Sequence, residues 1–317
     1  MRSILFIFLF YGVVAVWAQV NTFWGLTVQN DFLNYRGHGT DRYYTGGNQL
    51  DYFLFDEKSR FSRHHISFVQ QLYTPADLRD TLIRSLDYPY AGLLFLSYRI
   101  QHRPTASKTL WALSSSWGYS GRRAGARRTQ QLLHRVIGDE IPQGWEHIVE
   151  NGFFWQTAVL AGQPVFSFST SRILVYQAID WGLLFQRIRW GVQVLYNPMG
   201  WPMGSFPLFQ KTKQVLSRGG VTLFTTPTIT WVIRNRLLEG RPVTAVMSPG
   251  ERRNINKQLV GLEFGIGFTT AHGNIQFVQY LQQAEFSQAE PHAYGEITIR
   301  LALRTTRANK LVGVPHH

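Results

Sequence analysis

Apolar and polar residues alternate along most of this chain. In segment 188–194 the even positions are apolar and the odd positions are polar or small: Ile188, Trp190, Val192 and Val194 alternate with Arg189, Gly191 and Gln193. A period of two predicts β-strands with one apolar and one polar face. A charged side chain is costly in a dry core but not in a water-filled lumen. The pattern therefore favours a membrane barrel, apolar outside and polar inside, over a β-sandwich.

Segments of this kind recur along the whole chain, with turn residues between them. We predict strands near 20–31, 43–55, 62–73, 90–102, 108–119, 152–166, 170–184, 187–197, 220–234, 257–270, 274–285 and 293–304. An even number of strands is what a closed antiparallel barrel prefers. The predicted fold is all-β: a transmembrane antiparallel barrel of about twelve strands. We find no internal repeat and no linker, so residues 19–317 are expected to form one barrel domain.

The connections between the predicted strands alternate in length. The turns near 56–61, 103–106 and 271–273 are short, whereas the links 32–42, 74–89, 120–151 and 235–256 are long. Outer-membrane barrels have short periplasmic turns and long outer loops. If the first strand starts on the periplasmic side, all four long links lie at the cell surface. The link 198–219 is the exception, since it is long and would be periplasmic.

One segment in the third long link reads as a helix. Residues 122–140 carry four arginines in seven residues, followed by Gln130 and His134 and then by Gly138, where a helix would stop. Positions 130 and 134 are four residues apart, so their side chains share a helix face. We predict a short extracellular helix over the mouth of the barrel.

Composition places the chain outside the cytoplasm. Residues 1–18 combine Arg2, an apolar run and small residues at Ala15 and Ala18, as in a secretory signal peptide cut before Gln19; a retained anchor helix is the alternative. The chain has no cysteine and 15% aromatic residues, which is typical of an exported barrel and not of a disulfide-stapled domain.

The net charge of +13 indicates an anionic partner. Nucleic acid, an anionic membrane surface and an anionic substrate would each explain it. Export excludes nucleic acid from the expected partners. The arginines cluster in the predicted loops, which favours lipid headgroups.

Four polar clusters are expected at the outer rim of the barrel. They are Asn30–Asp31, the stretch Thr40–Gly47, the stretch Asp87–Gly92, and the helix with Gln130 and His134. Each alone has an ordinary explanation as a turn, a strand start, a proline turn with an interfacial tyrosine, or a solvated histidine. Their shared position at one end of the barrel favours a site.

The residue types in these clusters suit ester hydrolysis. A histidine has a pKa near neutrality and accepts a proton from water. Oxygens of Asn30, Asp31 and Glu140 suit a hard divalent cation that polarises a carbonyl. The chain contains neither a GxSxG elbow nor a cysteine nor HExxH, so serine, cysteine and zinc-peptidase mechanisms have no motif support.

The ordered motifs resemble those of the outer-membrane lipid A 3-O-deacylases. The matching stretches are NDF at 30–32, TDRYYTGG at 40–47, QQLYTP at 70–75, DYPYAG at 87–92 and QQLLHRVIGDEIPQGW at 130–145. The resemblance covers residues 30–152. It implies a twelve-stranded outer-membrane barrel that hydrolyses, with calcium, the ester holding the 3′ acyloxyacyl chain of lipid A.

The resemblance also implies roles for single residues. His134 would be the general base. Asn30, Asp31 and Thr45 would be active-site residues with Gln130 and Glu140 nearby, and the ligands of calcium would be Asp31, Glu140 and Asn30.

One departure from the family concerns the loop after the YTP-like motif. The family has a lysine there, whereas segment 76–86 has only the cations Arg79 and Arg84. Arginine forks match phosphate geometry, so we expect Arg79, Arg84, Arg127 and Arg128 to bind lipid A phosphates. The alternative for these arginines is a solvated basic loop facing anionic lipid heads.

The expected function is thus a lipid A deacylase in the bacterial outer membrane, with its site facing the cell surface. Lipopolysaccharide is the expected substrate, outer-membrane lipids the surroundings, and a monomer the expected state. Two alternatives remain. Another outer-membrane acyl hydrolase, such as a phospholipase, would turn over phospholipids, and a non-enzymatic porin-like barrel would conduct ions.

Overall fold

The computed structural model describes most of the barrel and its outer end. The described residues are 21–35, 42–55, 62–79, 87–102, 109–199, 220–240, 253–270 and 272–303. The predicted signal peptide, Arg84, most of the link 198–219 and the C-terminal tail lie outside them.

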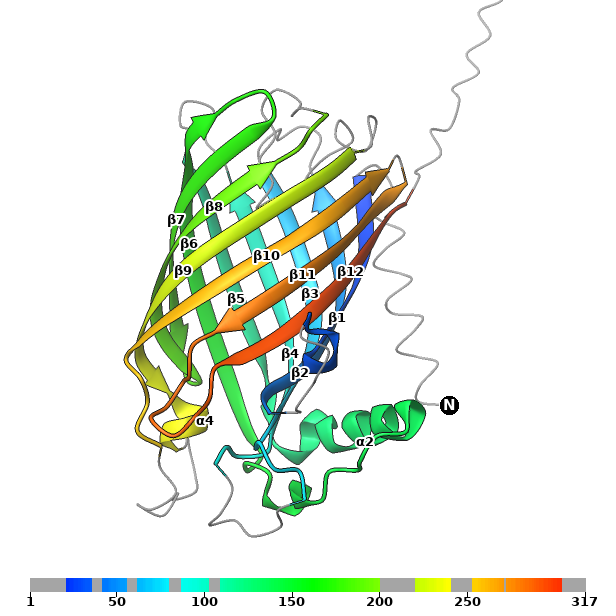
Figure 1. The fold of residues 1–317 in the computed structure, drawn as a ribbon, viewed down its shortest axis with the longest axis vertical. Coiled ribbons are helices and arrows are strands. Elements are labelled where there is room, and N and C mark those ends of the chain that lie inside the picture. Colours follow the sequence, from blue (N-terminus) through cyan, green and yellow to red (C-terminus); the bar gives the residue numbers. More distant parts are fainter. Residues whose placement is uncertain are drawn as a thin grey trace, which may run out of the picture.

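Twelve strands form one closed antiparallel barrel in which neighbours in sequence pair and β1 pairs with β12 (Figure 1). The strands are β1 (Asn21–Asn30), β2 (Tyr43–Phe55), β3 (Ser62–Thr74), β4 (Ala91–His102), β5 (Leu110–Ser120), β6 (Gly152–Ser167), β7 (Ser171–Gly182), β8 (Phe185–Tyr196), β9 (Gly220–Asn235), β10 (Gln258–Thr270), β11 (Gly273–Gln282) and β12 (His292–Leu303). All predicted strands are confirmed. The largest error is at the end of β11, which was expected at 285 and lies at Gln282.

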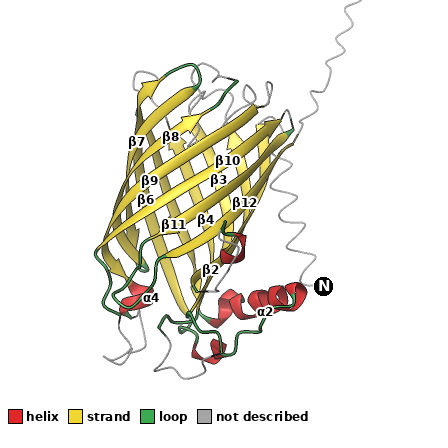
Figure 2. Ribbon diagram, in the orientation of Figure 1, coloured by secondary structure: helices red, strands yellow, loops and turns green. Residues whose placement is uncertain are grey.

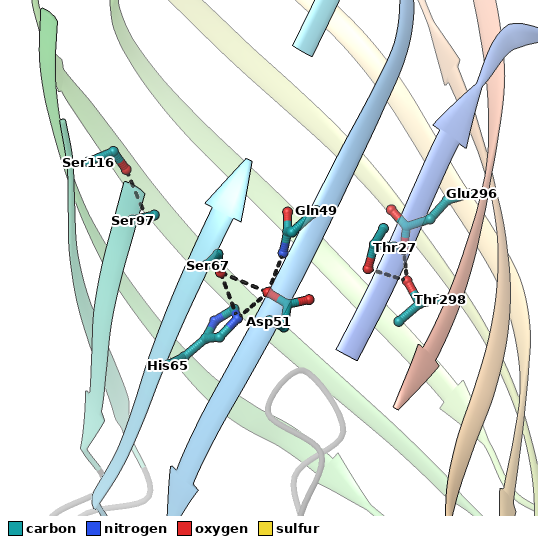
Figure 3. Close-up of polar contacts among 9 residues, drawn as sticks. All are labelled: Thr27, Gln49, Asp51, His65, Ser67, Ser97, Ser116, Glu296 and Thr298. Atoms are coloured by element: carbon teal, nitrogen blue, oxygen red, sulfur yellow. Dashed lines mark hydrogen bonds and ion pairs between the residues drawn. The ribbon is translucent and has the colours of Figure 1, made fainter. Parts of the chain in front are cut away.

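The strands present apolar side chains outward and polar side chains inward, as predicted. On β4, Leu96 and Tyr98 are exposed on the outer wall, while Ser97 between them accepts a hydrogen bond from Ser116 of β5 at 2.9 Å inside the barrel. Figure 3 shows this inner wall, with its short polar contacts between neighbouring strands. Successive side chains thus face lipid and the polar lumen in turn, which explains the alternation of apolar and polar residues in the sequence.

The described helices are short and lie in the connections. They are η1 (Asp31–Leu33), η2 (Arg122–Ala124), α2 (Ala126–Ile137), η3 (Gly144–His147) and α4 (Arg236–Glu239). The helix α2 ends at Gly138, which adopts a left-handed conformation with φ 75°, so the predicted stop is correct. Figure 2 places α2 and α4 at the same end of the barrel. Within the described residues, no helix is both long and apolar enough to cross a membrane.

An apolar cluster lies at this outer end of the barrel. We call it the mouth cluster; it consists of Tyr43, Tyr73, Tyr88, Ala91, Leu93, Phe154, Leu184, Val232, Leu237, Leu238, Ile255, Leu259 and Phe286. The ring of Tyr43 packs 5.6 Å from Tyr88 and 5.7 Å from Phe286, centroid to centroid. Because strands, α4 and the outer connections all contribute, the mouth cluster ties the loops to the barrel wall.

The helix α2 projects sideways from the barrel wall and does not cover the mouth (Figure 1). The prediction that it lies over the mouth was therefore wrong. The physical reason is that α2 finds a complementary surface on the outer side of β3 and β4, where Gly92 leaves room for Ala126.

Candidate active site

A β-bulge at Thr45 turns this residue to the outer wall of the barrel. Tyr44 pairs with Tyr73 and Gly46 pairs with Leu72, so Thr45 is an extra residue in β2. A bulge interrupts the alternation of side chains. Tyr44 points into the lumen, where its hydroxyl bonds the side chain of Gln29, while Thr45 lies on the opposite side of the strand.

Asn30, Asp31 and Thr45 meet at this bulge. The amide Nδ2 of Asn30 donates to the carbonyl oxygen of Thr45 at 3.2 Å, and the Asn30 Oδ1 accepts from the backbone N–H of Phe32 at 2.8 Å. Asp31 is 1% exposed, and its Oδ2 accepts from the backbone N–H of Arg42 at 3.1 Å. The first turn η1 thus holds the two neighbouring polar side chains against the end of β2.

The glycines of the TGG motif allow this close packing. A Cβ on Gly46 would lie 2.9 Å from the carbonyl oxygen of Gln29 and 3.3 Å from Nδ2 of Asn30. At the edge of β2 that faces β3, the Thr45 hydroxyl is hydrogen-bonded to the Thr74 hydroxyl at 2.5 Å. We call Asn30, Asp31, Thr45 and Thr74 the strand group.

The helix α2 docks on the outer wall beside the strand group. Gln70 of β3 donates from Nε2 to the carbonyl oxygen of Ala124 at 2.7 Å and accepts from the hydroxyl of Thr129 at 3.0 Å. A Cβ on Gly92 of β4 would lie 2.6 Å from the Cβ of Ala126, so the glycine lets the helix approach the wall. The buried contact consists of Ala126 from the helix together with Leu72, Tyr90 and Trp145.

Gln130 and His134 lie on the buried face of α2, with exposed fractions of 1% and 2%. Gln130 Oε1 accepts from the indole Nε1 of Trp145 at 2.8 Å. His134 Nδ1 forms a short hydrogen bond with the carbonyl oxygen of Glu140. A carbonyl only accepts, so Nδ1 carries the hydrogen and the lone pair of the neutral ring is on Nε2. We call Gln130, His134, Glu140 and Trp145 the helix group.

The carboxylate of Glu140 is bound by Arg79. The guanidinium Nε donates to Oε1 at 2.7 Å and to Oε2 at 2.8 Å, and this hydrogen bond raises the pKa of Arg79. The sequence predicted that Arg79 binds the substrate and that Glu140 binds a cation. In the structure the side chains of these two residues pair with each other. Arg84 lies outside the described residues.

The strand group and the helix group lie on the same wall at the same end of the barrel. The strand group stands at the ends of β1, β2 and β3, and α2 contacts β3 and β4. The expected proximity of Asn30, Asp31 and Thr45 is therefore found, and so is that of Gln130, His134 and Glu140. Asp31 and Glu140 belong to different groups, and Arg79 engages Glu140.

The residues fit a hard cation in part. Asn30 and Asp31 supply the amide and carboxylate oxygens that calcium prefers. In the described part of the chain, no three His, Asp or Glu side chains are placed to hold a metal ion. A cation held by Asn30, Asp31 and Glu140 together would require Glu140 to leave Arg79.

Arg127 and Arg128 are exposed in the first turn of α2. Over the described ranges, neither guanidinium takes part in an ion pair. The N-terminus of a helix carries a partial positive charge, so these two cations are unfavourable there without an anion. A bound anion would be stabilised by both the guanidinium groups and the helix dipole.

Sequence reasoning missed three residues that support the site. Gln70 holds the helix on the wall, Thr74 bonds the hydroxyl of Thr45, and Trp145 bonds Gln130. All three stand inside the quoted motifs QQLYTP and QQLLHRVIGDEIPQGW. The spacing of a motif shows which residues are together in sequence but not which of them touch.

A second histidine cluster lies in the lumen and does not have the geometry of a nucleophile site. Asp51 Oδ1 lies 2.6 Å from His65 Nε2 and accepts from Ser67 at 2.8 Å (Figure 3). The Ser67 hydroxyl also meets the same ring nitrogen, Nε2, at 2.8 Å. A catalytic triad needs the acid and the serine on different ring nitrogens. We interpret this cluster as part of the polar packing of the lumen.

The comparisons with known proteins agree with this fold. A family model described as outer membrane protein LpxR matches residues 4–303. The solved structure of LpxR from Salmonella typhimurium matches with a TM-score of 0.72 at 20% identity, covering 88% of this chain and 99% of that chain. No curated protein sequence matches.

Two other barrels show only a general likeness. The β domain of the Bordetella autotransporter BrkA gives a TM-score of 0.43 at 7% identity, with 90% of this chain and 100% of that chain covered. The COG4313 outer membrane channel from Pseudomonas putida F1 gives 0.42 at 8%, with 90% and 96% covered. Neither supports an argument about function.

The family match extends over nearly the whole chain of 317 residues. The Salmonella structure, at 20% identity, supports the twelve-stranded fold. Together these findings confirm the predicted family, the outer-membrane location and the enzyme class. The chain belongs to the LpxR family of outer-membrane lipid A 3-O-deacylases.

Proposed function

We propose that this enzyme hydrolyses the ester of the 3′-linked acyloxyacyl chain of lipid A at the outer wall of its barrel, facing the cell surface. The observation that carries the proposal is the orientation of His134. Its Nδ1 is hydrogen-bonded to the Glu140 carbonyl on the buried face of α2, which leaves the lone pair of the neutral ring on Nε2. This is the tautomer that a general base requires.

His134 takes a proton from water through Nε2, and the water oxygen attacks the ester carbonyl. The acyl C–O bond then breaks, and the imidazolium returns its proton to the departing sugar oxygen. The products are a carboxylic acid and a sugar hydroxyl. The Glu140 carbonyl stabilises the imidazolium through Nδ1, as the acid of a catalytic triad does.

Asn30 and Thr45 are proposed to position the ester. Both lie at the bulge on the outer wall, where the Thr45 side chain is 1% exposed and is held by Thr74. Gln130 has a positioning role, because its hydrogen bond to Trp145 fixes the helix segment that carries His134.

Asn30 and Asp31 would hold a calcium ion, with Glu140 joining them after release from Arg79. A bound calcium supplies polarisation of the ester carbonyl. In this role Asp31 keeps the cation against the first turn η1, where its carboxylate is already fixed by the backbone N–H of Arg42.

The phosphates of lipid A are proposed to bind Arg127, Arg128, Arg79 and Arg84. Arg127 and Arg128 are exposed at the start of α2, close in sequence to His134. Arginine binds phosphate through two parallel hydrogen bonds, which fixes orientation as well as affinity.

The mouth cluster weighs against a porin. Its apolar side chains pack against one another at the outer end of the barrel, whereas a porin needs a continuous aqueous path there. Planar bilayer recordings with purified protein are expected to show no porin-like conductance steps.

The experiment that tests the proposal is mass spectrometry of lipid A from cells expressing the intact protein or His134→Ala, with and without a calcium chelator. We expect loss of a mass equal to one acyloxyacyl chain with the intact protein only, and no loss with chelator. Unchanged lipid A in cells that carry folded, inserted barrel would contradict it. Turnover of phospholipids in place of lipid A would identify a phospholipase.

A further inference from the structure

The surface of α2 is divided into three stripes. The buried stripe consists of Ala126, Gln130 and His134. The basic stripe consists of Arg127, Arg128, Gln131 and Arg135. The apolar stripe consists of Leu132, Leu133, Val136 and Ile137, whose exposed fractions are 62%, 40%, 75% and 44%.

The apolar stripe is too large to be an ordinary feature of a water-exposed helix. Four large exposed apolar side chains lie within six consecutive residues, fewer than two helical turns, and contiguous exposed apolar patches mark interaction surfaces. An apolar stripe with arginines on the opposite side is typical of a helix that lies in a membrane interface. The basic stripe gives the polar side the charge that attracts anionic headgroups.

The position of α2 places the apolar stripe beside the lipid-facing wall. The helix rests on the outer side of β3 and β4, whose own outward residues Phe68 and Leu96 are 52% and 48% exposed. Figure 1 shows α2 projecting away from the barrel at its outer end. The helix that carries the apolar stripe therefore lies beside the surface that the barrel presents to lipid, at the outer ends of the strands.

We propose that α2 is an interfacial helix whose apolar stripe inserts among the acyl chains of the outer leaflet, while its arginines lie at the level of the lipid phosphates. The partner is the lipid surface itself. This proposal rests on the membrane location and the exposed side chains, and it holds whichever ester the enzyme cleaves.

Membrane insertion of α2 has a consequence for access to the site. The buried stripe with His134 faces the wall, and the apolar stripe beside it faces acyl chains. A lipid therefore reaches the strand group sideways from the leaflet, without leaving the membrane.

The absence of cysteine makes the test direct. Val136→Cys and Arg135→Cys place a nitroxide spin label on neighbouring residues of the apolar and basic stripes. Leu113→Cys, 49% exposed on the outer wall of β5, is the lipid-facing reference. The labelled full chain is reconstituted in vesicles of phosphatidylethanolamine and phosphatidylglycerol, and collision rates with oxygen and with a water-soluble nickel chelate are measured.

The measured quantity is the ratio of the collision rate with oxygen to the collision rate with the nickel chelate. We expect this ratio at Val136 to be close to that at Leu113 and severalfold higher than that at Arg135. Leu132→Cys against Gln131→Cys should give the same contrast one turn earlier. Equal nickel access at Val136 and Arg135 would overturn the proposal. Exclusion of both reagents from Val136 would also overturn it, because the stripe would then be covered by a second copy or another protein. Resistance of each variant to unfolding in detergent shows that the barrel is intact.

Discussion

The hydrogen bond between Gln130 and Trp145 is the residue-scale feature on which the position of His134 depends. Both side chains are 1% exposed, and the bond joins α2 to η3. When one partner of a buried hydrogen bond is removed, the free energy that the other partner lost on leaving water is no longer offset by that bond. The local structure around His134 should therefore respond to either change.

Gln130→Leu is expected to destabilise the α2 segment by about 1–3 kcal/mol, because the indole N–H of Trp145 loses its acceptor. Hydrogen exchange of the α2 amides measures this. Trp145→Phe alone takes the indole donor away from the Gln130 oxygen, while the double variant removes both partners. A double variant whose loss equals the sum of the single losses would contradict the coupling.

At the residue scale, sequence reasoning named candidate site residues but not their contacts. Asn30 and His134 stand in ordered motifs with recognisable chemistry, so they could be named in advance. The pairing of Arg79 with Glu140 could not be, because the two residues are 61 positions apart and no periodicity relates them. Which carboxylate meets which cation is decided by loop geometry.

At the scale of elements, the close contact of α2 with β4 explains why the helix lies on the wall. Gly92 leaves room for Ala126 at a position where any side chain would push the helix outward. The strands themselves were predictable, because lipid outside and polar packing inside impose a period of two on every one of them. The bulge at Thr45 was not predictable, since it breaks that period.

Gly92→Ala is expected to lower deacylation strongly while the barrel stays folded. The new Cβ would lie 2.6 Å from the Cβ of Ala126 and 3.1 Å from that of Ala124, so α2 has to move. Product formation on lipid A measures the effect. Gly267→Ala on β10 is the matched control, because the nearest atoms there are 3.9 Å away. Equal activity of the two variants would refute the role of this contact.

At the scale of the whole molecule, the mouth cluster joins the outer connections into one cap. Glu285 lies beside it, where its carboxylate accepts from Gln282 Nε2 at 2.7 Å. Burial raises the pKa of Glu285 above its ordinary value of 4.5. A carboxyl group whose pKa is raised by folding binds its proton more tightly in the folded state.

The cap should therefore lose stability as pH rises from the ordinary glutamate pKa of 4.5 through the raised pKa of Glu285. Glu285→Gln, which stays neutral, is expected to flatten this dependence. The transition temperature of the purified barrel, followed by its gel mobility shift across acidic to neutral pH, measures the effect. An unchanged pH dependence in the variant would show that another group is responsible.

The most direct test of the central claim follows the hydrolysis itself. Purified enzyme and His134→Gln are incubated with lipid A in water enriched in oxygen-18, and the products are analysed by mass spectrometry. The account predicts that the intact enzyme releases an acid carrying one heavy oxygen and leaves an unlabelled sugar hydroxyl. The folded His134→Gln barrel should release almost none. Undiminished release by His134→Gln, or label on the sugar, would contradict His134-assisted attack of water on the ester carbonyl.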